Sequence, residues 1–99
     1  MNMQALMKQA QAMQKDIAKL KNEVEAMEFE GVSSFVTVRV NGKKEVLKVT
    51  ISKEASELQD DFSMLEDMIL LATNTALAKV DEAMESKMGK YSNMMSGLL

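Results

Sequence analysis

Two pairs of neighbouring acidic residues have the type and spacing to do chemistry. They are Asp60-Asp61 and Glu66-Asp67, and adjacent carboxylates can hold Mg²⁺ or share a proton in acid–base catalysis. The same four acids fall where a long segment of helical periodicity begins, and negative charge at a helix start interacts favourably with the helix dipole. We therefore interpret them as helix-start residues and assign them no catalytic role.

The composition excludes most other kinds of catalytic site. The 99 residues include no cysteine and no histidine, which excludes disulfides, thiolate zinc sites, cysteine nucleophiles and imidazole acid–base chemistry. The four glycines are isolated from one another, so the sequence has no phosphate-binding glycine loop. We expect no enzyme, no cofactor, no metal site and no small-molecule substrate.

Lysines gather on one side of the N-terminal segment. Lys8 and Lys15 are seven residues apart, and Lys19 lies one helical turn further on. Such a stripe is typical of a solvated helix surface, which the residues alone favour, and also of a helix that contacts phosphate groups. A second candidate patch consists of Arg39, Lys43, Lys44 and Lys48.

Charge is segregated along the chain, which the net charge of −3 conceals. Residues 1–21 contain four lysines and one acid, and residues 87–99 contain two lysines and no acid. Residues 54–67 contain six acids and no base. Both ends of the chain are basic, so the net charge does not argue against a polyanionic partner.

The secondary-structure elements that carry these charged residues can be predicted from the spacing of the apolar residues. Apolar residues from Met3 to Met27 recur in alternating steps of three and four, which predicts a helix over Asn2–Glu28 with an a/d heptad seam. Lys8 and Lys15 share the f position opposite this seam. The helix would be about 40 Å long at about 1.5 Å per residue.

Residues 28–51 change to a period of two, which predicts strands. The apolar sides of two strands are Val36, Val38 and Val40, and Leu47, Val49 and Ile51. Asn41-Gly42 marks the turn, and a loop over residues 41–44 would pair Val38 with Leu47 and Val36 with Val49. A short strand over Phe29–Ser33, bulged or bent at Gly31, precedes them.

The C-terminal half predicts a second long helix. Residues 52–60 are a polar connector with at most one helical turn, capped by Ser56. The helix runs from Asp61 to about Met88, is stopped by Gly89, and is followed by a flexible tail over residues 90–99. The chain is thus one α+β domain over residues 1–99, with the order α-β-β-β-α and a three-stranded antiparallel sheet.

The long first helix also predicts self-association. Three short strands form a platform of roughly 15 by 20 Å, so a helix of about 40 Å overhangs it and exposes part of its seam. The eleven methionines could serve a plastic partner surface or a copper site, but several fall on the two helical stripes, which favours core or interface. The predicted dimer interface comprises Leu6, Met13, Ile17, Leu20, Met68 and Leu71.

The whole pattern resembles the bacterial YbaB/EbfC family of nucleoid-associated proteins. The resemblance rests on LMKQAQAMQK at residues 6–15 and DDFSMLEDMILLATNTALAKV at residues 60–80, and it covers nearly the whole chain. It implies an intertwined, tweezers-like homodimer that binds double-stranded DNA, alters its conformation, and acts in nucleoid organisation and gene expression. DNA contact in the family is associated with the projecting first and last helices, which here carry Lys8, Lys15, Lys19, Lys79, Lys87 and Lys90.

Two functions remain open on the sequence. One is a DNA-binding homodimer, and the other is a protein-interaction adaptor whose methionine-rich helical faces hold a partner chain without direct DNA binding. No apolar run reaches the roughly 20 residues that a membrane span needs, and the N-terminal segment lacks the pattern of a signal peptide. We expect a soluble, cytoplasmic, nucleoid-associated protein with no membrane partner.

Overall fold

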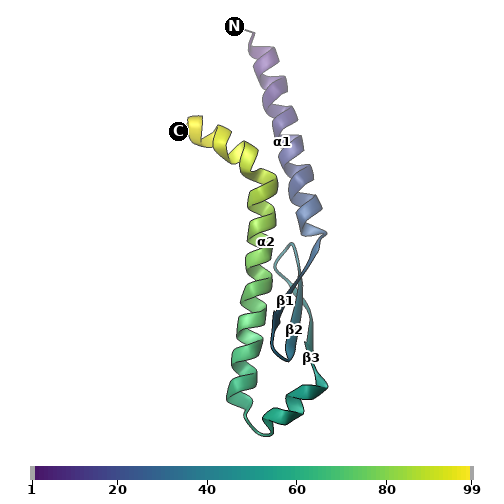
Figure 1. Ribbon diagram of the computed structural model, residues 1–99. Coiled ribbons are helices and arrows are strands. Elements are labelled where there is room, and N and C mark those ends of the chain that lie inside the picture. The colour runs from purple at the N-terminus through teal and green to yellow at the C-terminus, as the bar shows by residue number, and fades with distance from the viewer. Residues whose placement is uncertain (1, 99) are drawn as a thin grey trace.

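The computed structural model describes the backbone of residues 2–98 and the side chains of residues 2–89. It confirms the α-β-β-β-α order, with a short 3₁₀ helix between the last strand and the last helix (Figure 1). The elements are α1 (Met3–Glu25), β1 (Glu28–Ser33), β2 (Val36–Asn41), β3 (Val46–Ile51), η1 (Lys53–Leu58) and α2 (Phe62–Leu98). The connector is capped by Ser52, whose hydroxyl accepts a hydrogen bond from the Glu54 N–H at 3.4 Å, and the expected cap at Ser56 was wrong.

The three strands form one antiparallel sheet in the order β1-β2-β3. Val38 pairs with Val49 rather than with the predicted Leu47, because the register between β2 and β3 shifts next to Val40 and places Leu47 as an extra residue. The Asn41 side chain organises the turn by accepting hydrogen bonds from the N–H groups of Lys43 and Glu45. The left-handed residue of this turn is Lys44, with a φ of 65°, and not Gly42.

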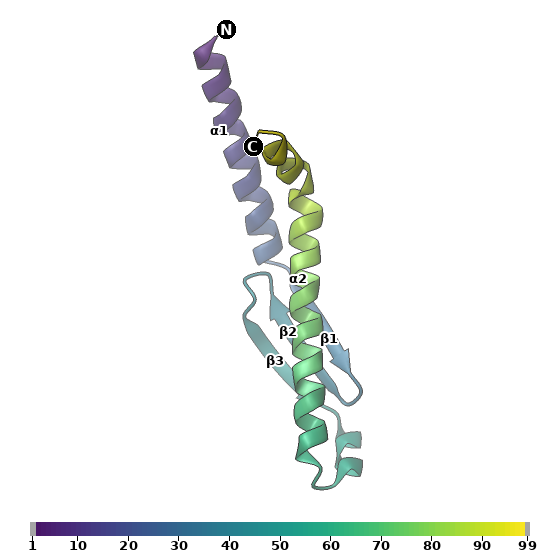
Figure 2. The ribbon, with the colours of Figure 1, turned by 90° about the vertical axis from the view of Figure 1, so that its left-hand side faces the viewer.

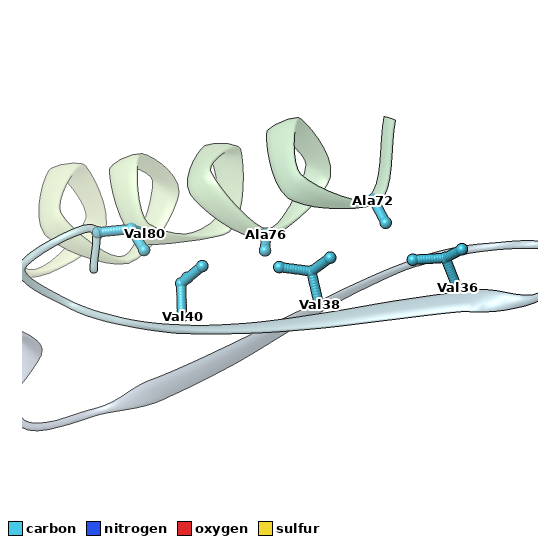
Figure 3. Packing of buried hydrophobic residues seen from close by; sticks show 6 residues of the cluster. All are labelled: Val36, Val38, Val40, Ala72, Ala76 and Val80. Atoms are coloured by element: carbon cyan, nitrogen blue, oxygen red, sulfur yellow. The ribbon is translucent and has the colours of Figure 1, made fainter. Parts of the chain in front are cut away.

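Helix α2 covers the sheet along β1 and β2. Its small residues Ala72 and Ala76, followed by Val80, lie directly over three valines of β2 (Figure 3). The six residues of this core, all essentially inaccessible to solvent, are Val36, Val38, Val40, Ala72, Ala76 and Val80. Because alanine leaves little side chain between helix and strands, the helix backbone approaches the sheet closely.

Gly31 is required by that close approach. A Cβ atom at this position would lie 2.6 Å from the backbone N of Ala76 and would overlap the carbonyl oxygen of Ala72. β1 pairs with β2 residue by residue with no break at Gly31, so the predicted bulge or bend was wrong. Gly42 has the same role at the end of α1, where an added Cβ would overlap the carbonyl oxygen of Val24.

Helix α2 does not stop at Gly89, as expected from the sequence, but continues to Leu98. A single glycine within a helix costs only about 1 kcal/mol relative to alanine, and the residues around it continue the helix. Figure 1 shows the last turns of α2 turning away from the axis of the rest of the helix. The side chains of residues 90–99 lie outside the described residues, so the flexible tail expected there stays a prediction.

The molecule is long and narrow, with principal extents of 71 × 23 × 13 Å. Figure 2 shows α1 leaving the sheet and projecting beyond it. We call residues 3–15 the arm. Val24 at the other end of the same seam is fully buried, whereas Met3 and Leu6 are 70% and 44% exposed, so the predicted overhang is confirmed.

Candidate nucleic-acid interface

The arm presents its lysines on one side and its apolar seam on the other. α1 begins at Met3, where the Asn2 side chain accepts a hydrogen bond from the Gln4 N–H at 3.0 Å. Lys8, Lys15 and Lys19 are all exposed. Helical periodicity places Lys8 and Lys15 on the side opposite the seam and Lys19 on the flank next to them. Lys8 and Lys15 are about 10 Å apart along the axis at about 1.5 Å per residue, so the three form a cationic stripe.

The charge of this stripe is not neutralised locally. None of the three lysines forms a salt bridge within the part of the chain whose side chains are described. The charged residues of 2–15 are Lys8 and Lys15 alone, with no acid among them. Asp16 and Glu23 flank a shallow depression with Lys19 and Leu20, so the potential is most positive toward the N-terminal end of α1.

The acidic segment, residues 54–67, lies at the opposite end of the molecule. It comprises η1, the loop after it and the first turns of α2, and Figure 1 places it at the bottom with the arm at the top. Asp61 accepts a hydrogen bond from the Met64 N–H at 3.1 Å, which is the helix-start role expected for it. The charge segregation seen in the sequence thus becomes a separation along the long axis, with the acids far from the arm.

Two of the other predicted lysines are engaged within the chain. Lys79 donates a hydrogen bond to the Glu30 carbonyl oxygen at 2.7 Å and lies beside β1, far from the arm. Lys87 is 4.0 Å from a carboxylate oxygen of Glu23 and so lies near the C-terminal part of α1. Lys90 lies outside the residues whose side chains are described. The structure therefore gathers Lys8, Lys15 and Lys19 on one helix and separates Lys79 from them.

Two of the four cations of the second patch, Arg39 and Lys44, are paired with acids. The Arg39 guanidinium donates to Glu30 on the outer side of the sheet at 2.9 Å, and this hydrogen bond raises the pKa of Arg39 above its ordinary value. Lys44 at the hairpin is 2.6 Å from Asp81 on α2. Each pair removes a cation from the set available to a phosphate, which makes this patch a weaker anion surface than the arm.

The predicted dimer-interface residues differ in their exposure. Leu6 and Leu71 are 44% and 59% exposed, and Met13, Ile17 and Leu20 are half-buried. Met68 packs against the core of its own chain.

A further apolar surface was missed by sequence reasoning. Val46, Val49 and Ile51 pair with the core valines of β2 and so share the helix-facing side of the sheet, yet they are 51%, 44% and 46% exposed because α2 lies over β1 and β2. Phe62 and Leu70 on α2 are exposed at 64% and 62%. The alternation in β3 was visible in the sequence, but the strand that the helix leaves uncovered was not.

Neither a cluster of potential metal ligands nor a membrane-spanning helix occurs among the described residues. No three acidic side chains gather into a group that could hold a metal ion in the part of the chain that the structure describes. Within residues 2–98, none of the helices combines the length and the hydropathy needed to cross a membrane.

Comparison with known proteins gives matches over nearly the whole chain. The YbaB/EbfC DNA-binding family matches residues 1–95. A nucleoid-associated protein of Ligilactobacillus salivarius is 40% identical over 100 residues, which cover 99% of this chain and 95% of that protein. A nucleoid-associated protein of Lachnoclostridium phytofermentans is 48% identical over 89 residues, covering 88% and 74% of the two chains. The crystal structure of an uncharacterized Helicobacter pylori protein shares the fold, with a TM-score of 0.70 at 21% identity over 96% of this chain and 98% of that chain.

Proposed function

The chain belongs to the YbaB/EbfC DNA-binding family, and from this premise we propose that it binds double-stranded DNA as a homodimer and alters the conformation of the duplex. The family consists of DNA-binding, nucleoid-associated proteins and is not a family of enzymes. The relatives named as nucleoid-associated proteins are bacterial, which supports a place in the bacterial nucleoid and a role in its organisation and in gene expression.

The observation that carries the proposal is the lysine stripe of α1. Lys8, Lys15 and Lys19 are exposed, lie on one side of a projecting helix, and have no salt-bridge partner in the described part of the chain. Lysine is a point charge that suits phosphate oxygens, and phosphate contacts supply most of the affinity of non-specific DNA binding. The acidic segment lies at the far end of the molecule, so a duplex held at the arm is not repelled at close range. We infer little sequence selectivity.

The uncovered apolar surface supports the homodimer. β3 exposes Val46, Val49 and Ile51 on its helix-facing side, and α2 exposes Leu70 and Leu71. Large apolar side chains exposed together along one side of a strand are typical of an interaction site. In a dimer with a two-fold axis, α2 of each copy can pack against β3 of the other, so the exposed apolar residues of both copies are covered by the same contact.

The deciding experiment reverses charge at the arm and at a matched site. Lys8→Glu with Lys15→Glu should abolish the mobility shift of a plain duplex, because both changes remove phosphate contacts and add repulsion. Lys43→Glu with Lys48→Glu makes the same change in net charge on the hairpin and outer sheet, where the exposed side chains lie away from the arm, and should retain most of the binding. Sedimentation of both variants checks that the oligomeric state is unchanged.

The outcomes separate the two functions left open by the sequence. If the hairpin variant alone lost binding, the sheet would be the DNA surface and the assignment to the arm would be wrong. If the unmodified protein shifted no duplex while remaining a dimer, the adaptor with methionine-rich helical faces would be the better function. Lys87→Glu with Lys90→Glu should weaken binding if the last helix also contributes.

A further inference from the structure

The apolar side of the arm has nothing covering it within the described part of the chain. Met3, Leu6 and Met7 are 70%, 44% and 60% exposed, although they continue the seam that buries Val24 completely. The stretch from residue 3 to residue 14 is a little shorter than two heptads and is about 18 Å long at about 1.5 Å per residue. An apolar ridge at the tip of a projecting helix is typical of a surface that packs against another helix.

The charges around this ridge indicate what kind of helix fits it. The positions that flank the seam within residues 3–14 are Met7, Gln9 and Gln14, none of them charged, and the first acid, Asp16, occupies the next flanking position. A strongly charged partner therefore finds no complementary charge at the seam. A second copy of the arm offers an apolar ridge with equally uncharged flanks, and the lysines of both copies point away from the contact, so like charges do not meet.

We propose that the apolar side of the arm pairs with the same side of the arm of a second copy of this chain. Pairing through the seams turns the lysine stripes to opposite outer sides of the helix pair. Each outer side can then hold a separate duplex, so the paired arms bridge two DNA segments. The bridging step rests on the DNA binding proposed above, whereas the pairing itself does not.

The pairing is expected to be weak for isolated molecules. The stretch 3–14 is at the lower end of the roughly 12–15 residues below which an isolated helix is marginal in water, so a contact of this length gains strength mainly when copies are held close together. Copies bound along a duplex are held close in this way, because tethering raises the effective concentration of one arm near another. DNA should therefore promote the pairing.

Disulfide cross-linking tests the pairing without DNA. The chain has no cysteine, so a single Leu6→Cys substitution on the seam gives one defined thiol per chain. The control Ala12→Cys places an exposed thiol on the side of the same helix that faces away from the seam. Under mild oxidation Leu6→Cys should form linked pairs of chains much faster than Ala12→Cys. Equal rates for the two variants would show only random collision and would overturn the pairing.

A capture assay tests the bridging. A duplex fixed to beads should retain a second, labelled duplex when the unmodified protein is present. Met3→Gln with Met7→Gln, which removes apolar contact and keeps the charge, should lose this capture while still shifting a single duplex. Ala5→Gln with Ala12→Gln, on the outward side of the arm, should keep both activities.

Each result of the capture assay has a definite reading. Undiminished capture by the Met3→Gln, Met7→Gln variant would overturn the bridging role of the seam. Failure of the unmodified protein to capture a second duplex, although it binds a single one, would overturn it as well. Failure of every protein to shift a single duplex would instead reject the DNA-binding function, and the cross-linking rates would still decide whether the arms pair.

Discussion

Replacing Gly31 by alanine tests the closest contact between helix and sheet. The new Cβ would overlap the Ala72 carbonyl oxygen and lie 2.6 Å from the Ala76 backbone N. Both atoms belong to the backbone of α2, so no flexible side chain can move aside. The helix must shift away from the sheet, and contacts with Val36 and Val38 loosen with it.

The expected loss of stability follows from the same contact. Overpacking a well-packed core usually destabilises by about 1–3 kcal/mol, and a clash with helix backbone belongs at the upper end of that range. Alanine loses less backbone entropy on folding than glycine, which stabilises the folded state by about 0.5–1 kcal/mol. We therefore expect Gly31→Ala to lower the free energy of unfolding by about 2 kcal/mol in total. In a domain of this size that lowers Tm by roughly 8–16 °C, which thermal unfolding followed by circular dichroism measures.

Gly89→Ala is the matched control, because an added Cβ there meets no atom of the described residues within 4 Å. Alanine in a helix interior is favoured over glycine by about 1 kcal/mol, so this variant should melt higher than the unmodified protein. Both variants are compared at one protein concentration, since the stability of a homodimer depends on it. An unchanged Tm for Gly31→Ala would refute the close approach of α2 to β1.

Three further predictions address association, seam and DNA. Leu71→Glu should dissociate the dimer, as measured by sedimentation. Val32→Glu should not, because Val32 is equally exposed at 59% but lies on the outer side of β1. Equal behaviour of the two variants would place the interface elsewhere. Ile17→Lys or Leu20→Lys should lower Tm or dissociate the protein, because each puts a charge on a half-buried seam residue; unchanged melting of both would mean that this part of the seam is solvated. With about four to six phosphates neutralised per dimer, the logarithm of the affinity for duplex DNA should fall against the logarithm of salt concentration with a slope of about −4 to −5, and a slope near zero would reject phosphate contact.

Much of the fold is already determined by local periods in the sequence. The alternating three-and-four spacing from Met3 to Met27 can be satisfied only by a helix, and the two-residue period around Val36–Val40 only by a strand, so the element order was predicted correctly. The position of Lys8 and Lys15 opposite the seam follows from the same helical period. These features depend on neighbours within a few residues, which the sequence contains.

Only the tertiary structure decided which parts of the chain meet. The sequence alone suggested a bend in the strand at Gly31. In the structure this glycine is needed because the backbone of Ala72 and Ala76, more than forty residues away, lies against it. Likewise, Lys79 was predicted to contact DNA, yet it donates a hydrogen bond to the Glu30 carbonyl oxygen. The alternation in β3 was visible in the sequence, but not that α2 leaves this strand uncovered. Local propensity fixes where helices and strands form, whereas the placement of α2 over β1 and β2 results from the packing of side chains that are distant in sequence.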